Sequence, residues 1–181
     1  MIPAARRLDE ATNAREKLME TGWRLHGISL GLLILRVGLG AYLFTHGWPK
    51  LQMLLAGEGG QFADPMGVGP TASLFLIMSA EVFCAALVIV GLGTRFFAIP
   101  IVIGMGVAAF VAHGDDPWTM GAAAELYAAG EADSWASKEP ALLYFIPFAA
   151  LIFTGPGRFS LDTVISVLWR GRQGDAPQEE E

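Results

Sequence analysis

Apolar residues in this chain collect in long blocks that polar segments separate. The blocks cover residues 28–47, 70–91, 96–112 and 141–155, and each is too long for an ordinary buried strand. A helix needs roughly 20 residues to cross a bilayer at about 1.5 Å per residue. The first two blocks reach this length, and the flanks of the shorter two can lie in the interfaces. We therefore predict an all-α integral membrane four-helix bundle with spans at about 28–47, 70–91, 95–113 and 139–155.

The segments outside the bundle, which is predicted to occupy residues 28–155, are more polar. Residues 1–27 are predicted to form a polar, partly amphipathic helix in the cytoplasm. Residues 122–129 fit either a short helix on the membrane or an ordered loop. Residues 156–170 predict an interfacial helix, because Ser160 can cap a helix whose first turn holds Asp162. The acidic end, residues 171–181, is predicted to be disordered.

Composition and charge support a membrane location. The chain is 53% hydrophobic and 17% charged, whereas soluble domains are about 25% charged. Nine Lys and Arg residues fall before the first span, between the second and third spans or after the fourth, and only Lys50 and Lys138 fall on the other side. This asymmetry predicts a multi-pass protein of the bacterial inner membrane with both termini cytoplasmic. The net charge of −6 and its pattern give no indication of nucleic-acid binding.

Two opposite charges interrupt the first two spans. Arg36 lies eight residues from the inner end of the first predicted span, and Glu81 lies ten from the inner end of the second. These positions correspond to roughly 12 and 15 Å of helix, so the two charges are predicted to form an ion pair near mid-bilayer. The pair either locks two helices in register or serves a polar-headed ligand or a proton site.

A second polar group is predicted at the outer face. His46 and His113 end the first and third spans, Glu139 precedes the fourth, and Lys50 follows the first. These groups could contact a quinone carbonyl, bind a metal or pass protons, or they could simply bond to loop carbonyls. No two of them share a short helical ligand spacing, so no metal site is predicted. Cys84, the single cysteine, is interpreted as a packed thiol.

Several motifs occur together in a fixed order. They are "LRVGLGAYLFTHGWPKL" at 35–51, "MGVGPTASLFLIMSAEVFCAALVIVGLGTR" at 66–95, His113, and "FTGPGRFSLD" at 153–162. On these residues the chain resembles the DoxX family of four-helix membrane proteins across roughly residues 30–165. The family-like positions are Arg36, Gly40, His46, Gly47, Lys50, Glu81, Gly91, Arg95, His113, Gly155, Gly157, Ser160 and Asp162.

The resemblance implies a function linked to quinones, since the family is named after a subunit associated with a thiosulfate:quinone oxidoreductase and a quinol oxidase. It implies a quinone-associated subunit of a membrane redox complex, with protein partner subunits and no covalently bound cofactor. Arg36, Glu81 and His46 are the candidate quinone-binding residues, and Lys50, His113 and Glu139 are further candidates for the ligand or proton site.

Two other functions remain open, namely a non-catalytic accessory or scaffold subunit and a small transporter or lipid-ligand binder. The sequence contains no dinucleotide-binding glycine motif, no Cys-x-x-Cys-His and no iron–sulfur spacing. Electrons would therefore come from a partner, and whether this chain is itself an enzyme stays open.

Overall fold

The computed structural model describes the backbone of residues 4–174 and the side chains of residues 21–170. Every regular element in this part of the chain is helical, which confirms the predicted all-α class. The elements are α1 (Ala4–Leu55), the 3₁₀ turn η1 (Gly59–Gln61), α2 (Pro70–Met78), the π-helical segment η2 (Ser79–Cys84), α3 (Ala85–Val90), α4 (Thr94–Val107), the π-helical segment η3 (Ala108–Ala112), α5 (Met120–Ala128), α6 (Glu139–Thr154) and α7 (Leu161–Gly174).

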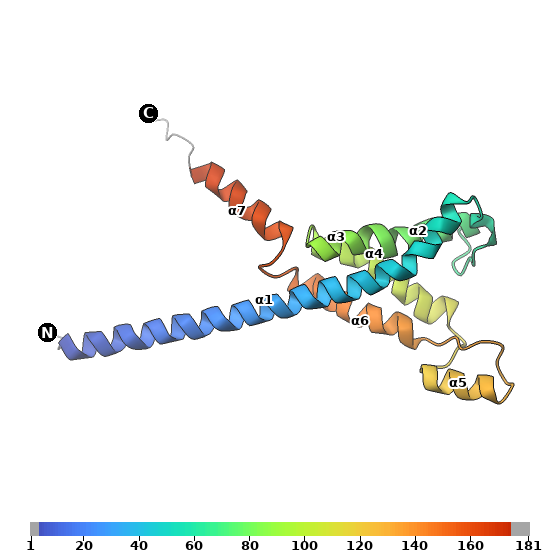
Figure 1. Cartoon of the computed structure of the whole chain (residues 1–181), viewed down its shortest axis with the longest axis horizontal. Helices are drawn as coiled ribbons and strands as arrows, with labels where there is room; N and C mark the ends of the chain where they lie inside the picture. The colour runs from blue at the N-terminus through green and yellow to red at the C-terminus, as the bar shows by residue number, and fades with distance from the viewer. Residues whose placement is uncertain (1–3, 175–181) are drawn as a thin grey trace.

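Four helical rods form the bundle. They are α1, the continuous run α2–η2–α3, the run α4–η3, and α6 (Figure 1). Thr21–Leu55, Pro70–Val90 and Thr94–Ala112 are long and apolar enough to cross a membrane. Helix α6 has 16 residues, or about 24 Å, which is shorter than a bilayer core of about 30 Å. Three of the four predicted spans therefore have the length of a crossing helix, and the crossing by α6 stays a prediction.

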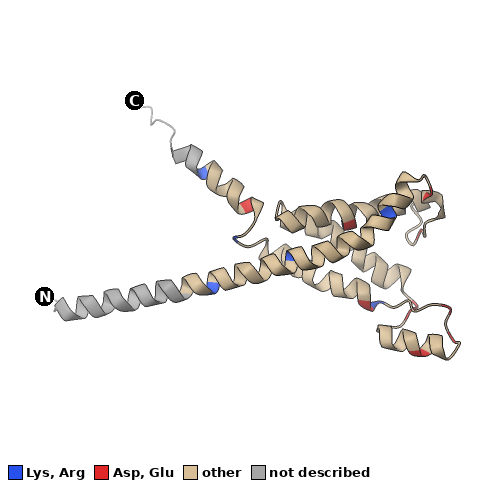
Figure 2. Cartoon of the chain, viewed as in Figure 1, with Lys and Arg blue, Asp and Glu red and all other residues tan. Residues whose placement is uncertain are grey.

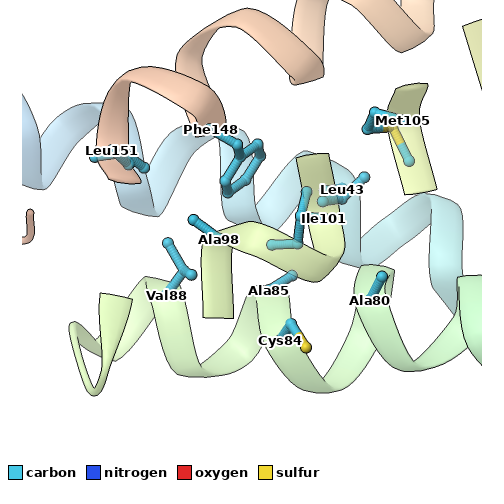
Figure 3. Close-up of a cluster of buried hydrophobic side chains, with 10 residues drawn as sticks. All are labelled: Leu43, Ala80, Cys84, Ala85, Val88, Ala98, Ile101, Met105, Phe148 and Leu151. Atoms are coloured by element: carbon cyan, nitrogen blue, oxygen red, sulfur yellow. The ribbon is translucent and has the colours of Figure 1, made fainter. Parts of the chain in front are cut away.

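The surface of the bundle suits a lipid environment. Large apolar side chains lie exposed on its flanks, among them Ile34, Phe75, Phe96, Ile103 and Phe153. Figure 2 shows that charged residues are sparse along the packed rods. In water such a surface would be an aggregation liability, whereas acyl chains cover it at no cost. The interior is a small cluster of buried residues contributed by all four rods, with Phe148 and Leu151 of α6 packed over Ala98 and Ile101 of α4 (Figure 3).

The terminal segments differ in part from the predictions. Helix α1 is continuous through residue 27, so the N-terminal segment is not a separate helix but an extension of the first span. This extension and α7 leave the bundle at the same end (Figure 1). Residues 122–129, for which a short helix and an ordered loop were both left open, lie largely in the short helix α5, and the helix predicted within 156–170 is present as α7. Helix α7 continues through Gly174, so the predicted disorder of 171–174 is wrong, and residues 175–181 lie outside the described part.

Two glycines of α1 set its register against the second rod. A Cβ added at Gly40 would lie 2.5 Å from Cγ1 of Ile89, and one added at Gly47 would lie 2.6 Å from Cγ2 of Val82. Backbones can approach this closely only where side chains are absent. The two antiparallel rods therefore place Gly40 opposite Ile89 and Gly47 opposite Val82.

One end of the bundle is closed by the turn after α3 and the segment before α7, and we call it the Gly91 end. The Asp162 carboxylate accepts hydrogen bonds from the backbone N–H groups of Gly93, at 2.8 Å, and Thr94, at 3.4 Å. It thereby caps α4, while the Asp162 N–H donates to the Gly91 carbonyl at 3.0 Å. Ser160 caps α7 as predicted, its hydroxyl oxygen accepting from the Thr163 N–H at 3.3 Å.

Arg36 of α1 fills the space beneath this turn. Its side chain is fully buried, and its Nη1 donates to the Val88 carbonyl at 3.4 Å and its Nη2 to the Phe159 carbonyl. Asp162 is close enough to interact electrostatically with the guanidinium. Gly91 has a φ of +74° and leaves the room that Arg36 needs, because a Cβ there would lie 1.9 Å from Nη1. One arginine thus joins the first rod to both chain segments that close the Gly91 end.

Replacing Gly91 by alanine is expected to disrupt this end. The left-handed backbone costs a residue with a Cβ about 1–2 kcal/mol, and the new methyl group also displaces the buried guanidinium. We expect a large fall in folded yield, measured by size-exclusion chromatography of detergent-solubilised protein. Gly38→Ala is the matched control, since nothing lies within 4 Å of the added atom. Equal yields for the two variants would contradict the packing described for Arg36.

Candidate functional site

A cavity of about 570 Å³ lies on the side of the bundle away from the Gly91 end. Its walls come from the second and third rods, and the loop at 56–69 and the end of α1 complete it. Apolar side chains provide most of the lining, including Phe62, Met66, Leu76, Ile77, Ile103 and Val107. The charged and polar groups that reach it are Lys50, Glu81, Ser73 and His113. Its size and apolar lining with few polar groups are those of a ligand pocket.

An ion pair between Lys50 and Glu81 borders the cavity. The Lys50 Nζ lies 2.5 Å from the Glu81 Oε2, and the Glu81 side chain is only 5% exposed. Gly47 makes this pairing possible, because α1 passes so close to η2 that a Cβ at Gly47 would lie 2.8 Å from the Glu81 Cβ. Lys50, one turn further along α1, then extends to the carboxylate. Inside a membrane a charged pair is costly, and such pairs usually mark a ligand or ion site.

Both π-helical segments contribute to the same cavity. Glu81 lies within η2, while Ala108 and Ala112 of η3 and the following His113 line the opposite wall. A π-helical turn accommodates an additional residue and interrupts the regular α-helical hydrogen bonding. Such turns are rare and occur most often at functional sites. Because both π-helical segments of the described part of the chain border this cavity, we treat it as the candidate functional site.

The predicted pairing of Arg36 with Glu81 is wrong. Arg36 bonds to carbonyls at the Gly91 end, whereas Glu81 lies beside Gly47, which is eleven residues, or about 16 Å, further along α1. The prediction assumed that the apolar blocks of the two helices begin and end at the same level. They do not, because α1 continues past the Gly91 end and Arg36 lies level with the turn after α3. Glu81 nevertheless has a cationic partner, and it is Lys50.

The predicted cluster of His46, His113 and Glu139 does not form as one group. His46 contacts the Tyr42 carbonyl at 3.1 Å and the ring of Tyr144, with 5.6 Å between ring centroids. His113 pairs with Asp116 at 2.7 Å and lines the cavity. The Glu139 carboxylate accepts from the Met120 N–H at 2.7 Å at the start of α5. The three residues lie on different elements and make separate contacts, because each has a partner on its own helix, in the adjoining loop or at the start of α5.

The polar surroundings of Glu81 include a second predicted residue besides Lys50. His46 and Tyr144 both lie close enough to Glu81 for an electrostatic interaction. Tyr144 of α6 was missed, because a tyrosine within an apolar run is also typical of simple packing. Among the described residues, no group of three or more His, Cys, Asp or Glu side chains could hold a metal ion.

Asp64, also missed, holds the loop that covers one end of the cavity. Its carboxylate accepts from the Ser73 hydroxyl at 2.6 Å and from the backbone N–H groups of Gly69, at 2.7 Å, and Val68, at 3.1 Å. The Ser73 hydrogen bond is the largest cause that lowers the pKa of Asp64 below its usual value. The contribution of Asp64 to the stability of this loop is therefore present at neutral pH and is lost as pH falls through the lowered pKa. An aspartate shortly before Gly69-Pro70 at a helix start is the sequence signal that could have indicated this role.

The fold and the cavity together define a helical membrane protein with an internal ligand-sized site. The DoxX family model matches residues 31–114, from α1 to the residue after His113. This part of the chain is a DoxX domain, and the resemblance drawn from its motifs is confirmed. The matched residues include Arg36, Lys50, Glu81 and His113, whereas α6 and α7 lie outside the match. No curated protein and no solved structure matches the chain.

The partner of Glu81 can be identified by a double-mutant cycle. Lys50→Met leaves a buried carboxylate unpaired, and Glu81→Gln added to it removes that penalty. We expect a coupling free energy of about 1–3 kcal/mol for Lys50 and Glu81, but additive effects within about 0.5 kcal/mol for Arg36→Met combined with Glu81→Gln. The measurement is the free energy of unfolding in mixed micelles. A stronger coupling of Glu81 to Arg36 than to Lys50 would contradict the assigned pair.

Proposed function

We propose that this membrane protein binds a quinone in the cavity beside Lys50 and Glu81 and acts as the quinone-associated membrane partner of a redox complex. The observation that carries the proposal is the apolar cavity of about 570 Å³ with one buried ion pair in its wall. A quinone has a flat, largely apolar ring with two carbonyl oxygens, so it requires apolar walls and a few hydrogen-bond donors. This cavity provides that combination.

The polar side chains around the cavity have complementary roles in this proposal. The Lys50 ammonium has three N–H donors, of which the Glu81 carboxylate takes one and the His46 carbonyl, at 3.4 Å, a second, so one remains to donate to a quinone carbonyl. Glu81 can accept the hydroxyl proton of the reduced form, and His113 on the opposite wall presents an imidazole. His46 and Tyr144 extend the polar surroundings of Glu81. In this scheme Arg36 is a structural residue rather than a quinone ligand.

The surfaces beyond the Gly91 end support a second candidate function, that of an accessory or scaffold subunit. Trp23 and Ile28 of α1 and Val164 and Leu168 of α7 are all more than half exposed, and all four belong to the helices that extend away from the bundle. Apolar side chains at such positions favour contact with a partner subunit or the membrane surface. The two functions are compatible, since a subunit can both hold a quinone and anchor a partner.

The orientation in a bacterial inner membrane is proposed from the distribution of positive charge. The α1 extension and α7 leave the bundle at one end, and Lys and Arg residues predominate on that side of the predicted topology. We propose that the Gly91 end faces the cytoplasm and that the cavity lies nearer the opposite leaflet.

Filling the cavity should abolish quinone binding. Ala108 lines the cavity, and Ala108→Phe places a ring inside it, whereas Ala41→Phe adds the same ring on the exposed face of α1. We expect purified wild type and Ala41→Phe to retain quinone, measured by solvent extraction and mass spectrometry, and Ala108→Phe to retain at least about tenfold less, a loss of about 1.4 kcal/mol or more. A quinone-free wild type that fails to bind added quinone would refute the proposed function.

A further inference from the structure

One end of the cavity is lined by the loop between α1 and α2. Phe62, Ala63, Pro65 and Met66 all belong to the loop between α1 and α2, and all line the cavity at that end. Asp64 fixes this loop through the Ser73 hydroxyl and two backbone N–H groups.

The flank of the cavity is open. Leu76 of α2 and Ile103 of α4 both line the cavity, yet they are 52% and 60% exposed on the outside of the bundle. Ile103 is the tenth of the nineteen residues in Thr94–Ala112 and therefore lies at the middle of that span. Acyl chains rather than water surround this depth of a membrane protein. The cavity therefore communicates with the bilayer interior between α2 and α4.

The inner wall of the cavity and its opening differ in polarity. Lys50 and Glu81 provide charges and hydrogen-bonding groups at the inner wall, whereas the opening between Leu76 and Ile103 is apolar. A volume of about 570 Å³ suits a ring headgroup and the first part of a side chain, since drug-sized ligands occupy about 300–1,000 Å³. A long isoprenoid tail exceeds that volume, so the rest of it must lie outside the cavity.

We infer that the ligand is a long-tailed quinone that loads sideways from the bilayer, with its headgroup at Lys50–Glu81 and its tail passing between α2 and α4 beside Leu76 and Ile103. This inference rests on the proposed function and adds a tail subsite and a route of access to it. Neither the ion pair nor the size of the cavity by itself specifies that route. The exposure of Leu76 and Ile103, which line the cavity and lie within two of the membrane-spanning helices, supports that route.

The test compares two quinones that share a headgroup. One is a tailless benzoquinone added from water, and the other is an isoprenoid-tailed quinone supplied in the lipid of nanodiscs that hold the full chain. Ile103→Trp, and Leu76→Trp as a second variant, narrow the opening on its two sides. Ile99→Trp is the matched control, because Ile99 lies one turn away on α4, is also exposed and does not line the cavity.

We expect Ile103→Trp and Leu76→Trp to slow loading of the tailed quinone by about tenfold or more, a typical range for association rates within one site. Because both residues also line the cavity, binding of the tailless quinone is expected to change, but by less than loading of the tailed quinone. Size-exclusion chromatography of the purified variants shows whether they are folded. Ile99→Trp should change neither ligand.

The outcomes separate the two proposals. If wild type binds both quinones and the tryptophan variants affect both equally or neither, the lateral route is overturned while the proposed function stands. If wild type binds neither quinone, both are overturned. A tightly held phospholipid that is found in the cavity by mass spectrometry and does not exchange for quinone also overturns the inference.

Discussion

The burial of Arg36 under the Gly91 turn is the constraint on which the rest of the structure depends. A guanidinium removed from water needs acceptors, and here the carbonyls of Val88 and Phe159 serve that purpose while Asp162 supplies opposite charge. Together with Arg36, these groups come from three segments that are distant in sequence. The two hydrogen bonds of one side chain therefore hold α1 against α3 and against the segment before α7, while Asp162 ties the start of α7 to the start of α4. Gly91 and Gly40 leave the room for this approach.

The register fixed at that end determines what forms in the middle of the bundle. With Gly40 opposite Ile89, Gly47 must lie opposite Val82, and Lys50 then extends to Glu81. The carboxylate thus lies beside a cavity rather than within packed core, because space remains between the second and third rods near the two π-helical segments. A buried ion pair contributes little to stability by itself, since desolvation offsets most of the attraction. Its position against a ligand-sized, lipid-open cavity is better explained by binding.

The helices were predictable because long apolar blocks and a capping serine are local signals. Ser160 at the start of α7 needed only its own neighbours in sequence to be interpreted correctly. The partners of Arg36 and Glu81 were not predictable in this way. The register of the two helices depends on the glycines at which their backbones approach closely, and the partners of Arg36 are backbone carbonyls, which no sequence pattern identifies. The assumption of equal depth from the ends of the apolar blocks therefore gave the wrong pair. Lys50 and Glu81 were both recognised as candidates. Tyr144 was missed because its role arises only from tertiary contacts, whereas Asp64 was missed although its hydrogen-bond partners lie within nine residues of it.

Thiol cross-linking in native membranes tests this register most directly. In a Cys84→Ser background, which removes the single native cysteine, a short bifunctional thiol reagent should readily join Lys50→Cys to Glu81→Cys, because the two native side chains meet. The same reagent should not join Leu35→Cys to Glu81→Cys, because Leu35 lies fifteen residues, or about 22 Å of helix, from Lys50. Cross-linking of the Leu35 pair in place of the Lys50 pair would restore Arg36 as the partner of Glu81 and contradict the register that Gly40 and Gly47 define.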